Sequence, residues 1–563
     1  MIAELSPGLI LILGALLIPA LPRRLRQVYM LALPMLAGLQ LYGLEHGTFA
    51  QTQIFGYPLI LLRVDSLSVV FGTIFLIAAF LNVIYGLHER DTMQEVSGLF
   101  YAGAAIGAVF VGDLISLFVF WELTAISSVF LIWARRSERA YHAGMRYLII
   151  QVGSGVILLA GVVLHAQATG SIAFDKLGLV SLGTWLIFLA FGIKCAFPFL
   201  HNWLQDAYPE ATAVGTVVLS AFTTKLAIYA LARAYPGTEI LIYIGAIMTA
   251  FPVFFAVIEN DLRRVLAFSL NNQLGFMIAG IGVGSQIALN GAVAHAFVHI
   301  IYKALLFMSM GAVLHRVGTV KASELGGLFK SMPATAVFCM IGAASISAFP
   351  LFSGFVTKSL TLTGVAEAGY VISWLVLVFA SAGVLEHSGI KIPYFAFFAH
   401  DSGKRCQEAP LNMLVAMGIA AFLCIFLGVY PEPLYRLLPY AVDYQPYTVS
   451  HVLSQSQLLF FAMLAFAVLI RTGLYPAERP STNLNTDWIY RKALPAVVAW
   501  FLAIGGPARS SALSRAERRL ERMLVQIYRH HGPAGVLART LSTGNTVLWI
   551  AVLLGLTLLM SYL

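Results

Sequence analysis

Four charged residues of this chain lie within long apolar stretches. Glu122 lies in LFVFWELTAISSVFLIWA, Lys194 in WLIFLAFGIKCAFPFLHNWL, Lys225 in VVLSAFTTKLAIYALA and Lys358 in SISAFPLFSGFVTKSLTL. A charge at the centre of a membrane-spanning helix costs about 2.5–3.5 kcal/mol on insertion scales, so it needs a partner, water or a function. We interpret the lysines as proton carriers joined by water, and Glu122 as a charge that modulates one of them. The structural alternatives are a Glu122 neutralised by a buried Lys or Arg, and a Lys194 that reaches the membrane interface.

Helix breaks accompany two of these lysines. Lys194 comes four residues before Pro198, and Lys358 comes eight residues after Pro350. Proline removes a backbone donor and clashes with the carbonyl four residues back, so both spans are predicted to break. Broken helices at mid-membrane mark transport sites in several transporter folds, and the reversed order of Lys and Pro is interpreted as a pair of inverted five-helix repeats.

A third set of ionisable residues shares one helix face. His295, His299 and Lys303 follow one another at intervals of four residues in AVAHAFVHIIYKALLFM. Such a polar face suits a hydrated proton wire, because His titrates near neutrality. Hydrogen bonds between helices are the alternative, and a zinc site is not expected because no third ligand accompanies the histidines. Glu386 and Lys391 are weaker candidates, because they lie near a predicted span end.

The composition predicts an all-α polytopic membrane protein. The 563 residues are 59% hydrophobic and 11% charged, whereas soluble domains carry about 25% charge. The net charge of +9 comes from short loops and one C-terminal stretch, which reflects topology and predicts no nucleic-acid partner. The four cysteines form no CxxC pair, so no haem, iron–sulfur cluster, other cofactor or metal is expected.

Apolar runs long enough to cross a bilayer recur along the chain. The predicted spans are 5–21, 28–45, 66–86, 97–112, 114–135, 144–166, 181–202, 211–234, 237–258, 262–283, 286–314, 333–363, 370–397, 411–430, 452–470 and 543–562. About 14 of them form a core, with the seventh and twelfth broken. Basic residues alternate between successive loops, which predicts an amino terminus outside the cell. The first apolar run lacks a basic region before it, so no cleavable signal peptide is expected.

The C-terminal part adds a basic segment before the last span. Five arginines alternate with apolar residues there: Arg515, Arg518, Arg519, Arg522 and Arg529. The pattern predicts an amphipathic helix on the membrane surface or along a partner subunit, with a plain cytoplasmic helical tail as the alternative. The apolar piece Ala493–Ile504 is too short to span and is expected to be interfacial or re-entrant.

Five stretches carry a resemblance to a known superfamily: FVFWELTAISS, GIKCAFPFLHNWLQDAYPEA, NDLRRVLAFSLNNQLGFM, AHAFVHIIYKALLFMSMGAVLH and SAFPLFSGFVTKSL. They resemble the antiporter-like subunits of respiratory complex I, of membrane-bound hydrogenases and of Mrp-type cation/proton antiporters, over roughly residues 60–430. The resemblance implies two inverted five-helix bundles and no redox cofactor bound by this subunit. It also implies that Glu122 is the family's glutamate of the fifth helix, and that Lys194, Lys225 and Lys358 are the ionisable residues of the seventh, eighth and twelfth.

Within the superfamily, HNWLQDAYPEATAV and TDWIYRK are most similar to the D-type subunit of Mrp antiporters. The tail beyond about residue 440 is longer than in that subunit, and in outline resembles the lateral helix and final span of the largest complex I member. The resemblance implies a proton-translocating subunit of a Na⁺/H⁺ antiporter in the cell (inner) membrane, with other membrane subunits and the lipid bilayer as partners. The alternatives are a proton-pumping subunit of an NADH:quinone oxidoreductase or membrane-bound hydrogenase, and a proton channel coupled to another process such as inorganic-carbon uptake. The coupled cation, and whether the parent complex is an enzyme, stay open.

The expected organisation has six parts. They are N-terminal helices at 1–95, a first repeat at 97–234, a second, inverted repeat at 237–397, C-terminal helices at 411–470, the basic segment at 471–542 and a final helix at 543–563.

Overall fold

The computed structural model describes residues 5–54, 56–479, 483, 485–531 and 543–562. The chain divides into two units, Met1–Asn483 and Leu484–Leu563. All seven candidate site residues named from the sequence lie in the first unit, which also holds the packed hydrophobic core.

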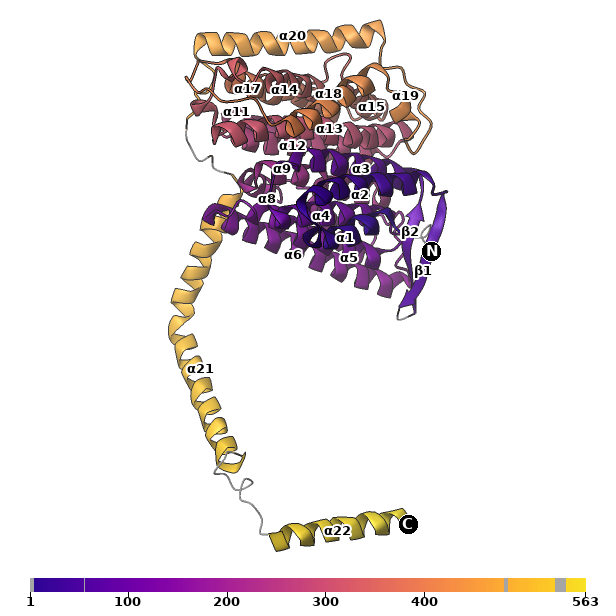
Figure 1. The fold of residues 1–563 in the computed structure, drawn as a ribbon, viewed down its shortest axis with the longest axis vertical. Helices are drawn as coiled ribbons and strands as arrows, with labels where there is room; N and C mark the ends of the chain where they lie inside the picture. Colours follow the sequence, from indigo (N-terminus) through magenta and orange to yellow (C-terminus); the bar gives the residue numbers. More distant parts are fainter. Residues whose placement is uncertain (1–4, 55, 480–482, 484, 532–542, 563) are drawn as a thin grey trace. The chain divides into compact units, whose positions relative to one another are not determined.

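The first unit consists of two neighbouring groups of helices (Figure 1). The first group contains α1 (Pro7–Leu17), α2 (Arg23–Tyr42), α3 (Ser66–Gly86), α4 (Thr92–Phe110), α5 (Leu114–Trp133), α6 (Glu138–Thr169), α7 (Leu182–Lys194), α8 (Asn202–Ala207), α9 (Ala213–Ala221) and α10 (Thr223–Ala234). The second contains α11 (Ile240–Ile258), α12 (Leu262–Val283), α13 (Gln286–Val317), α14 (Pro333–Ile346), α15 (Ser353–Glu367), α16 (Val371–Val384), α17 (Lys391–Pro393), α18 (Leu411–Val429), α19 (Glu432–Tyr435) and α20 (Val449–Thr472). The long α13 packs against α3 and α9, and so joins the two groups.

A β-hairpin connects α2 to α3. Strand β1 (Gly47–Ile54) pairs antiparallel with β2 (Tyr57–Val64), and Gly47 faces Val64 in the register. The hairpin is held to the helices because Ile60 N donates to the Asp113 carboxylate at 2.8 Å. The hairpin lies between the predicted spans 28–45 and 66–86, and no strand is predicted there from the sequence.

The seventh and twelfth spans are broken at the same tetrapeptide turn. The turns read AFPF at 196–199 and AFPL at 348–351. Ala196 and Phe199 have φ values of 61° and 68°, and Ala348 and Leu351 have φ values of 60° and 71°. Four non-glycine residues in the left-handed region are uncommon, so the shared geometry identifies the two turns as equivalent parts of a repeat. The prediction of two broken spans is confirmed.

The repeat also corrects the reasoning from the order of Lys and Pro. The two turns occur in the same sequence order, so inversion does not reverse neighbouring residues. Lys194 ends α7, before its turn, whereas Lys358 lies in α15, after its turn. The inversion arises because five spans are an odd number, and the next repeat therefore starts from the opposite side. The two lysines are thus non-equivalent positions of equivalent helices.

A second pair of features marks the repeat. Asp113 and Asp261 cap the N-termini of α5 and α12 with their side chains. Asp113 also forms an isolated β-bridge with Ala173, and Asp261 forms one with Lys321. In each half the bridge fixes the start of one helix to the loop that follows the next, which holds the long α6 and α13 in equivalent places.

Ten helices in the described part of the chain are long and apolar enough to cross a membrane. The shorter apolar helices include α7 and α14, because their spans are interrupted by the turns. Each predicted span overlaps a helix, although several bounds differ, as where the predicted span 144–166 extends to Glu138–Thr169.

The second unit contains α21 (Leu494–His531) and α22 (Thr543–Tyr562). The apolar piece Ala493–Ile504 is not a separate re-entrant element, because all but its first residue belong to the continuous α21. Arg518, Arg522 and their apolar neighbour Leu524 are exposed, while the Arg515 side chain lies outside the described residues. The placement of α21 on a membrane or a partner stays a prediction.

Candidate functional site

Lys194 lies at the last residue of α7 and is 0% exposed. Its Nζ donates to the Trp121 carbonyl at 2.6 Å and to Thr124 Oγ1 at 2.7 Å. The ammonium also lies 4.2 Å from the centre of the Trp121 ring, where the π face attracts a cation. Lys194 therefore points into the first bundle towards α5, which excludes the alternative in which it reaches the interface.

Glu122 follows Trp121 on α5 and is half-buried. Its charge interacts with that of Lys194, but none of the ion pairs formed within the described residues involves Glu122. The carboxylate packs on Gly155 of α6, where an added Cβ would lie 1.7 Å from Oε1. The glycine thus makes room for Glu122, and the carboxylate acts on Lys194 through space rather than as a bonded partner.

Lys225 lies beside a break that the sequence does not predict. The eighth span is interrupted at Phe222, between α9 and α10. The Lys225 Nζ donates to the carbonyl of Ser220 at 2.7 Å, and this lysine is fully buried. The Thr223 hydroxyl is hydrogen-bonded to Tyr101 of α4. Carbonyls in the last turn of a helix lack helical donors, so the lysine satisfies one that the interruption frees.

The two histidines on this face of α13 differ in their hydrogen bonding. Both ring nitrogens of His295 have partners, whereas those of His299 have none among the described residues. His295 Nδ1 lies 3.1 Å from Thr357 Oγ1, and its Nε2 lies 3.1 Å from Gln273 Oε1, which also accepts from Tyr302 at 3.1 Å. His299 is 0% exposed, yet neither of its ring nitrogens has a hydrogen-bond partner in the described structure. The alternative of interhelical hydrogen bonds therefore fits His295 and not His299, which needs water to complete its bonding.

Lys303 lies on the same face of α13, and Lys358 lies on α15, which packs against α13. Lys303 Nζ donates to Ser269 Oγ on α12 at 2.9 Å. Lys358 Nζ donates to the carbonyl of Ile346, the last residue of α14, at 2.7 Å. The twelfth-span break therefore supplies the acceptor for its own lysine, as the eighth-span break does for Lys225.

The charges of these lysines act on one another across the two bundles. Lys225 and Lys358 both act electrostatically on Lys303 and on His299. The structure thus brings six of the seven predicted residues into the buried interior, with Glu122 half-buried beside Lys194. Such a set of buried ammonium and imidazole groups can pass protons from one group to the next through water.

Sequence reasoning missed several polar residues of this row. Gln273, Tyr302 and Thr357 surround His295, and their uncharged side chains give no sequence signal. Lys391 was ranked low because it lies near a predicted span end, yet it is 0% exposed. Its Nζ donates to the carbonyls of Val257 and Glu259 at the end of α11, which holds the lysine away from the surface.

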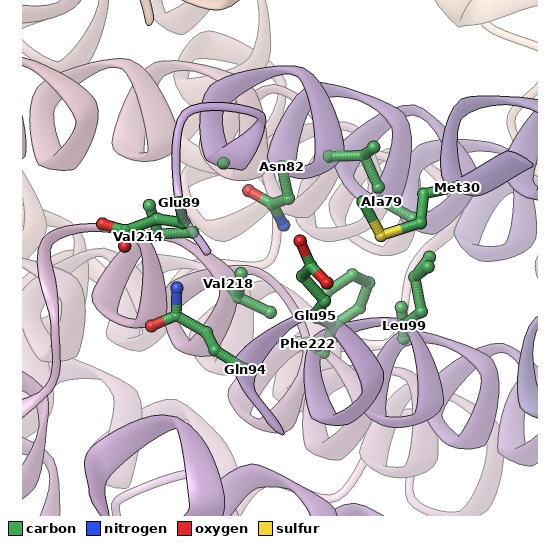
Figure 2. Close-up of a pocket in the computed structure, with 14 residues that line it drawn as sticks. Met30, Ala79, Asn82, Glu89, Gln94, Glu95, Leu99, Val214, Val218 and Phe222 are labelled. Carbon is green, nitrogen blue, oxygen red and sulfur yellow. The ribbon is translucent and has the colours of Figure 1, made fainter. Parts of the chain in front are cut away.

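A cavity of about 50 Å³ approaches the eighth-span break from the ends of α3 and α4 (Figure 2). Its lining includes Asn82, Gln94, Glu95 and Phe222. Figure 2 shows the Asn82 amide and the Glu95 carboxylate facing one another. Glu95 is paired with Arg26 at 3.1 Å. The volume admits water, so the cavity offers a largely apolar approach, with a few polar groups, that ends at Phe222.

Within the described residues, one group combines three potential metal ligands. The ligand atoms of His88, Glu89 and His315 all lie within 4.8 Å of one another. A tetrahedral zinc ion with bonds of about 2.1 Å needs ligand atoms about 3.4 Å apart. The donor set suits a transition metal, but its spacing is wider than a formed site requires.

The chain is similar to known proteins over about two thirds of its length. Residues 111–385 match the family described as NADH:quinone oxidoreductase/Mrp antiporter, TM. Hydrogenase-4 component B of Escherichia coli (strain K12) is 28% identical over 420 residues, which cover 65% of this chain and 62% of that protein. The D-type subunit of the Na(+)/H(+) antiporter of Alkalihalophilus pseudofirmus is 29% identical over 400 residues, which cover 66% of this chain and 79% of that protein. This chain spans less than two thirds of the length of the first curated relatives it matches.

A solved structure shares the fold. A chain of the Mrp complex from Dietzia sp. DQ12-45-1b superposes with a TM-score of 0.69 at 21% identity, covering 82% of this chain and 99% of that chain. The predicted fold class is confirmed: the protein is a predominantly α-helical, multi-pass membrane protein. Residues 111–385 therefore form a domain of the family described as NADH:quinone oxidoreductase/Mrp antiporter, TM.

Proposed function

We propose that this chain is the proton-translocating subunit of a multisubunit monovalent cation (Na⁺)/H⁺ antiporter. The observation that carries the proposal is the buried row of Lys194, Lys225, Lys303 and Lys358, each held by a carbonyl or hydroxyl acceptor. Four buried ammonium groups with no carboxylate bonded to them among the described residues are costly as purely structural elements. They are understandable as sites that gain and lose protons.

Each predicted residue has a role in this proposal. The proton is held in turn by Lys194, Lys225, Lys303 and Lys358. His299 links the two bundles through water. His295 is fixed by its partners and orients the hydrogen bonds around it. Glu122 favours the charged form of Lys194, so a movement of the carboxylate would favour proton release.

The same proposal specifies the partners of the chain, its membrane location and the coupled cation. The partners are other membrane subunits, H⁺, Na⁺ and the lipid bilayer. The chain lies in the cell (inner) membrane with its amino terminus outside, as the alternation of basic loops supports. The name of the Alkalihalophilus pseudofirmus relative supports Na⁺ as the coupled cation.

The test uses inside-out vesicles from the native membrane, in which a pH-sensitive dye reports the proton gradient. Addition of NaCl to energised vesicles should release the gradient, and Lys194→Ala should abolish that response while the protein still inserts. Lys321→Ala is the matched control, because this lysine is exposed and pairs with Glu324 in a loop. An unchanged response in Lys194→Ala would contradict the proposal.

The second candidate is a proton-pumping subunit of a membrane-bound hydrogenase or NADH:quinone oxidoreductase. The likeness to hydrogenase-4 component B favours it. Purification of the tagged chain in mild detergent, followed by mass spectrometry, separates the two. Small Mrp-type membrane subunits without redox proteins support the antiporter, whereas iron–sulfur or flavin proteins select the redox complex.

A further inference from the structure

The buried polar row continues beyond Lys303 towards the end of the thirteenth span. Ser269, which accepts from Lys303, also accepts from Ser388 Oγ at 2.8 Å. Ser388 Oγ in turn lies 2.8 Å from His387 Nδ1. Lys391 lies four residues further along the same segment, and both lysine charges act on His387. Buried hydrogen-bonding groups therefore lead from α13 to Lys391.

Lys391 ends this series at a buried ion pair. Its Nζ donates to the carbonyls of Val257 and Glu259, at 2.6 and 2.7 Å, where α11 ends. The same Nζ lies 2.9 Å from Glu478 Oε1, and the two side chains are 0% and 7% exposed. Desolvation makes a buried ion pair no more stabilising than well-packed apolar residues, so the pair is weak evidence for stability alone.

Glu478 is carried by the segment that follows α20, and this segment is fixed against the second bundle. Tyr475 N donates to the Leu469 carbonyl at 3.0 Å, and the Tyr475 ring packs on Phe466 with ring centres 5.1 Å apart. Asn483 Nδ2 donates to Glu259 Oε2 at 3.3 Å. Contacts made by residues before and after Glu478 in the sequence therefore hold its carboxylate beside Lys391.

A hollow of about 310 Å³ borders Glu478 of the ion pair. Its lining includes Glu478, Tyr475, Ser323 and His400, and His400 is exposed. A second hollow, of about 600 Å³, includes Glu386 and Pro476 in its lining. Glu478 thus lies between Lys391 and a water-accessible space.

We infer that Glu478 is the terminal proton acceptor of the row and exchanges protons between Lys391 and the hollow beside His400. In the step from Lys391 towards this hollow, the Lys391 ammonium gives one proton to Glu478 Oε1, which leaves a neutral amine and a carboxylic acid. The carboxylic acid then gives the proton to water in the hollow and becomes a carboxylate again. The inference rests on the proposed proton translocation, and it assigns the exit group to the part of the chain beyond the family match.

The environment of Glu478 supports this role. Burial raises the pKa of its carboxyl above the usual range, against the opposing effect of the Lys391 charge, and the Glu259 charge raises it further. A carboxyl with a raised pKa holds a proton long enough to pass it on near neutral pH. The other ionisable groups that face this region are Glu386, His387 and Arg264, the last of which lies 3.9 Å from Glu259.

The experiment measures dye-reported proton transport in inside-out vesicles that contain the intact native complex. Glu478→Gln should lower the transport rate at least about tenfold, because a positioned proton acceptor contributes that much or more. Glu432→Gln is the matched control, since Glu432 pairs with Arg436 on an exposed surface, and it should transport normally. Normal transport in Glu478→Gln would overturn the inference.

A double variant separates proton transfer from structural support. Glu478→Gln alone leaves the Lys391 charge buried without its partner, which destabilises the fold. Lys391→Met/Glu478→Gln removes both charges and should recover thermal stability. If Glu478 accepts protons, transport stays low in the double variant; if the pair is only structural, transport recovers together with stability, and the inference fails.

The same vesicles distinguish this inference from the proposed function. Lys194→Ala reports on the row itself, far from the ion pair in the sequence. Transport that survives Lys194→Ala contradicts the proposed function and the inference with it. Transport that is lost in Lys194→Ala but kept in Glu478→Gln contradicts only the exit role of Glu478.

Discussion

The Nζ of Lys225 donates a hydrogen bond to the carbonyl oxygen of Ser220, 2.7 Å away, across the interruption of the eighth span. The interruption and the lysine therefore form one unit, in which the free carbonyl holds the ammonium at a defined place. The position of this lysine in the bundle follows from the backbone as much as from its own side chain.

Lys225→Gln is expected to lower proton transport by roughly 100-fold, because it removes a positioned proton carrier. The glutamine amide still donates to nearby acceptors, so the protein should insert and assemble. The dye assay in inside-out vesicles measures the rate, and the amount of chain in the membrane is measured by immunoblot. Transport above a tenth of the wild-type rate would show that protons pass without this residue.

Gly155→Ala is expected to disturb Glu122 without changing any charge. The added Cβ would meet the Glu122 carboxylate at 1.7 Å, so the carboxylate has to move away from α6. Displacement of a group by about 1 Å can cost up to about 100-fold in rate, and we expect a loss between about 3-fold and 100-fold. Gly153→Ala is the control, because nothing lies within 4 Å of its added Cβ. Equal rates in the two variants would mean that the place of the carboxylate is unimportant.

Arg263→Met is expected to lower the stability of the protein, and not to act on the transport step itself. Arg263 is 1% exposed and donates to the carbonyls of Ala211 and Thr212 at 2.9 and 3.0 Å. Each buried acceptor left without a donor costs roughly 1–3 kcal/mol, so we expect a loss of about 3 kcal/mol or more. Thermal unfolding in detergent measures the change.

Arg264→Met is the control for Arg263→Met. Its side chain is 27% exposed and lies 3.9 Å from Glu259, so Arg264→Met should change the melting temperature little. Equal destabilisation by the two substitutions would show that the carbonyl contacts of Arg263 contribute nothing particular.

The stability of the protein is expected to fall in mild acid because of His88. Burial, and secondarily the neighbouring His315, lowers the pKa of the His88 imidazole to about 4 from 6.5. Between these values the unfolded chain binds a proton that the folded protein resists, so stability is full above pH 6.5 and declines as the pH falls towards 4.

His88→Asn should therefore flatten the dependence of the melting temperature on pH between about 7.5 and 5, as measured in detergent. His142→Asn changes an exposed histidine and should keep the wild-type profile. If the His88→Asn and wild-type profiles run parallel, another group causes the acid sensitivity.

The apolar runs and the two prolines were enough to predict the spans and the breaks in the seventh and twelfth of them. The break at Phe222 could not be predicted, because VVLSAFTTKLAIYALA contains neither Pro nor Gly. The hairpin Gly47–Val64 was not predicted either, and it is held in place by its contact with Asp113. These features are decided by tertiary packing, which overrides local preference.

The candidate site was predicted in its charged members and missed in its uncharged ones. Buried charges stand out because apolar surroundings make them costly. Gln273 and Ser269 do not stand out, since single polar side chains are common in helices. Lys391 is buried although it lies near a predicted span end, because carbonyls at the end of α11 accept from its Nζ, a tertiary contact that position along the span does not predict.

The two ring nitrogens of His299, which lack partners among the described residues, have a consequence for the membrane as an insulator. A continuous chain of protein hydrogen bonds from one face to the other would short-circuit the membrane potential at all times. In the proposed proton row, a proton passes through this ring only when water bridges it, because no described protein group is hydrogen-bonded to His299. Under that proposal the row conducts only while the ring is hydrated, so the membrane potential is retained between transport events.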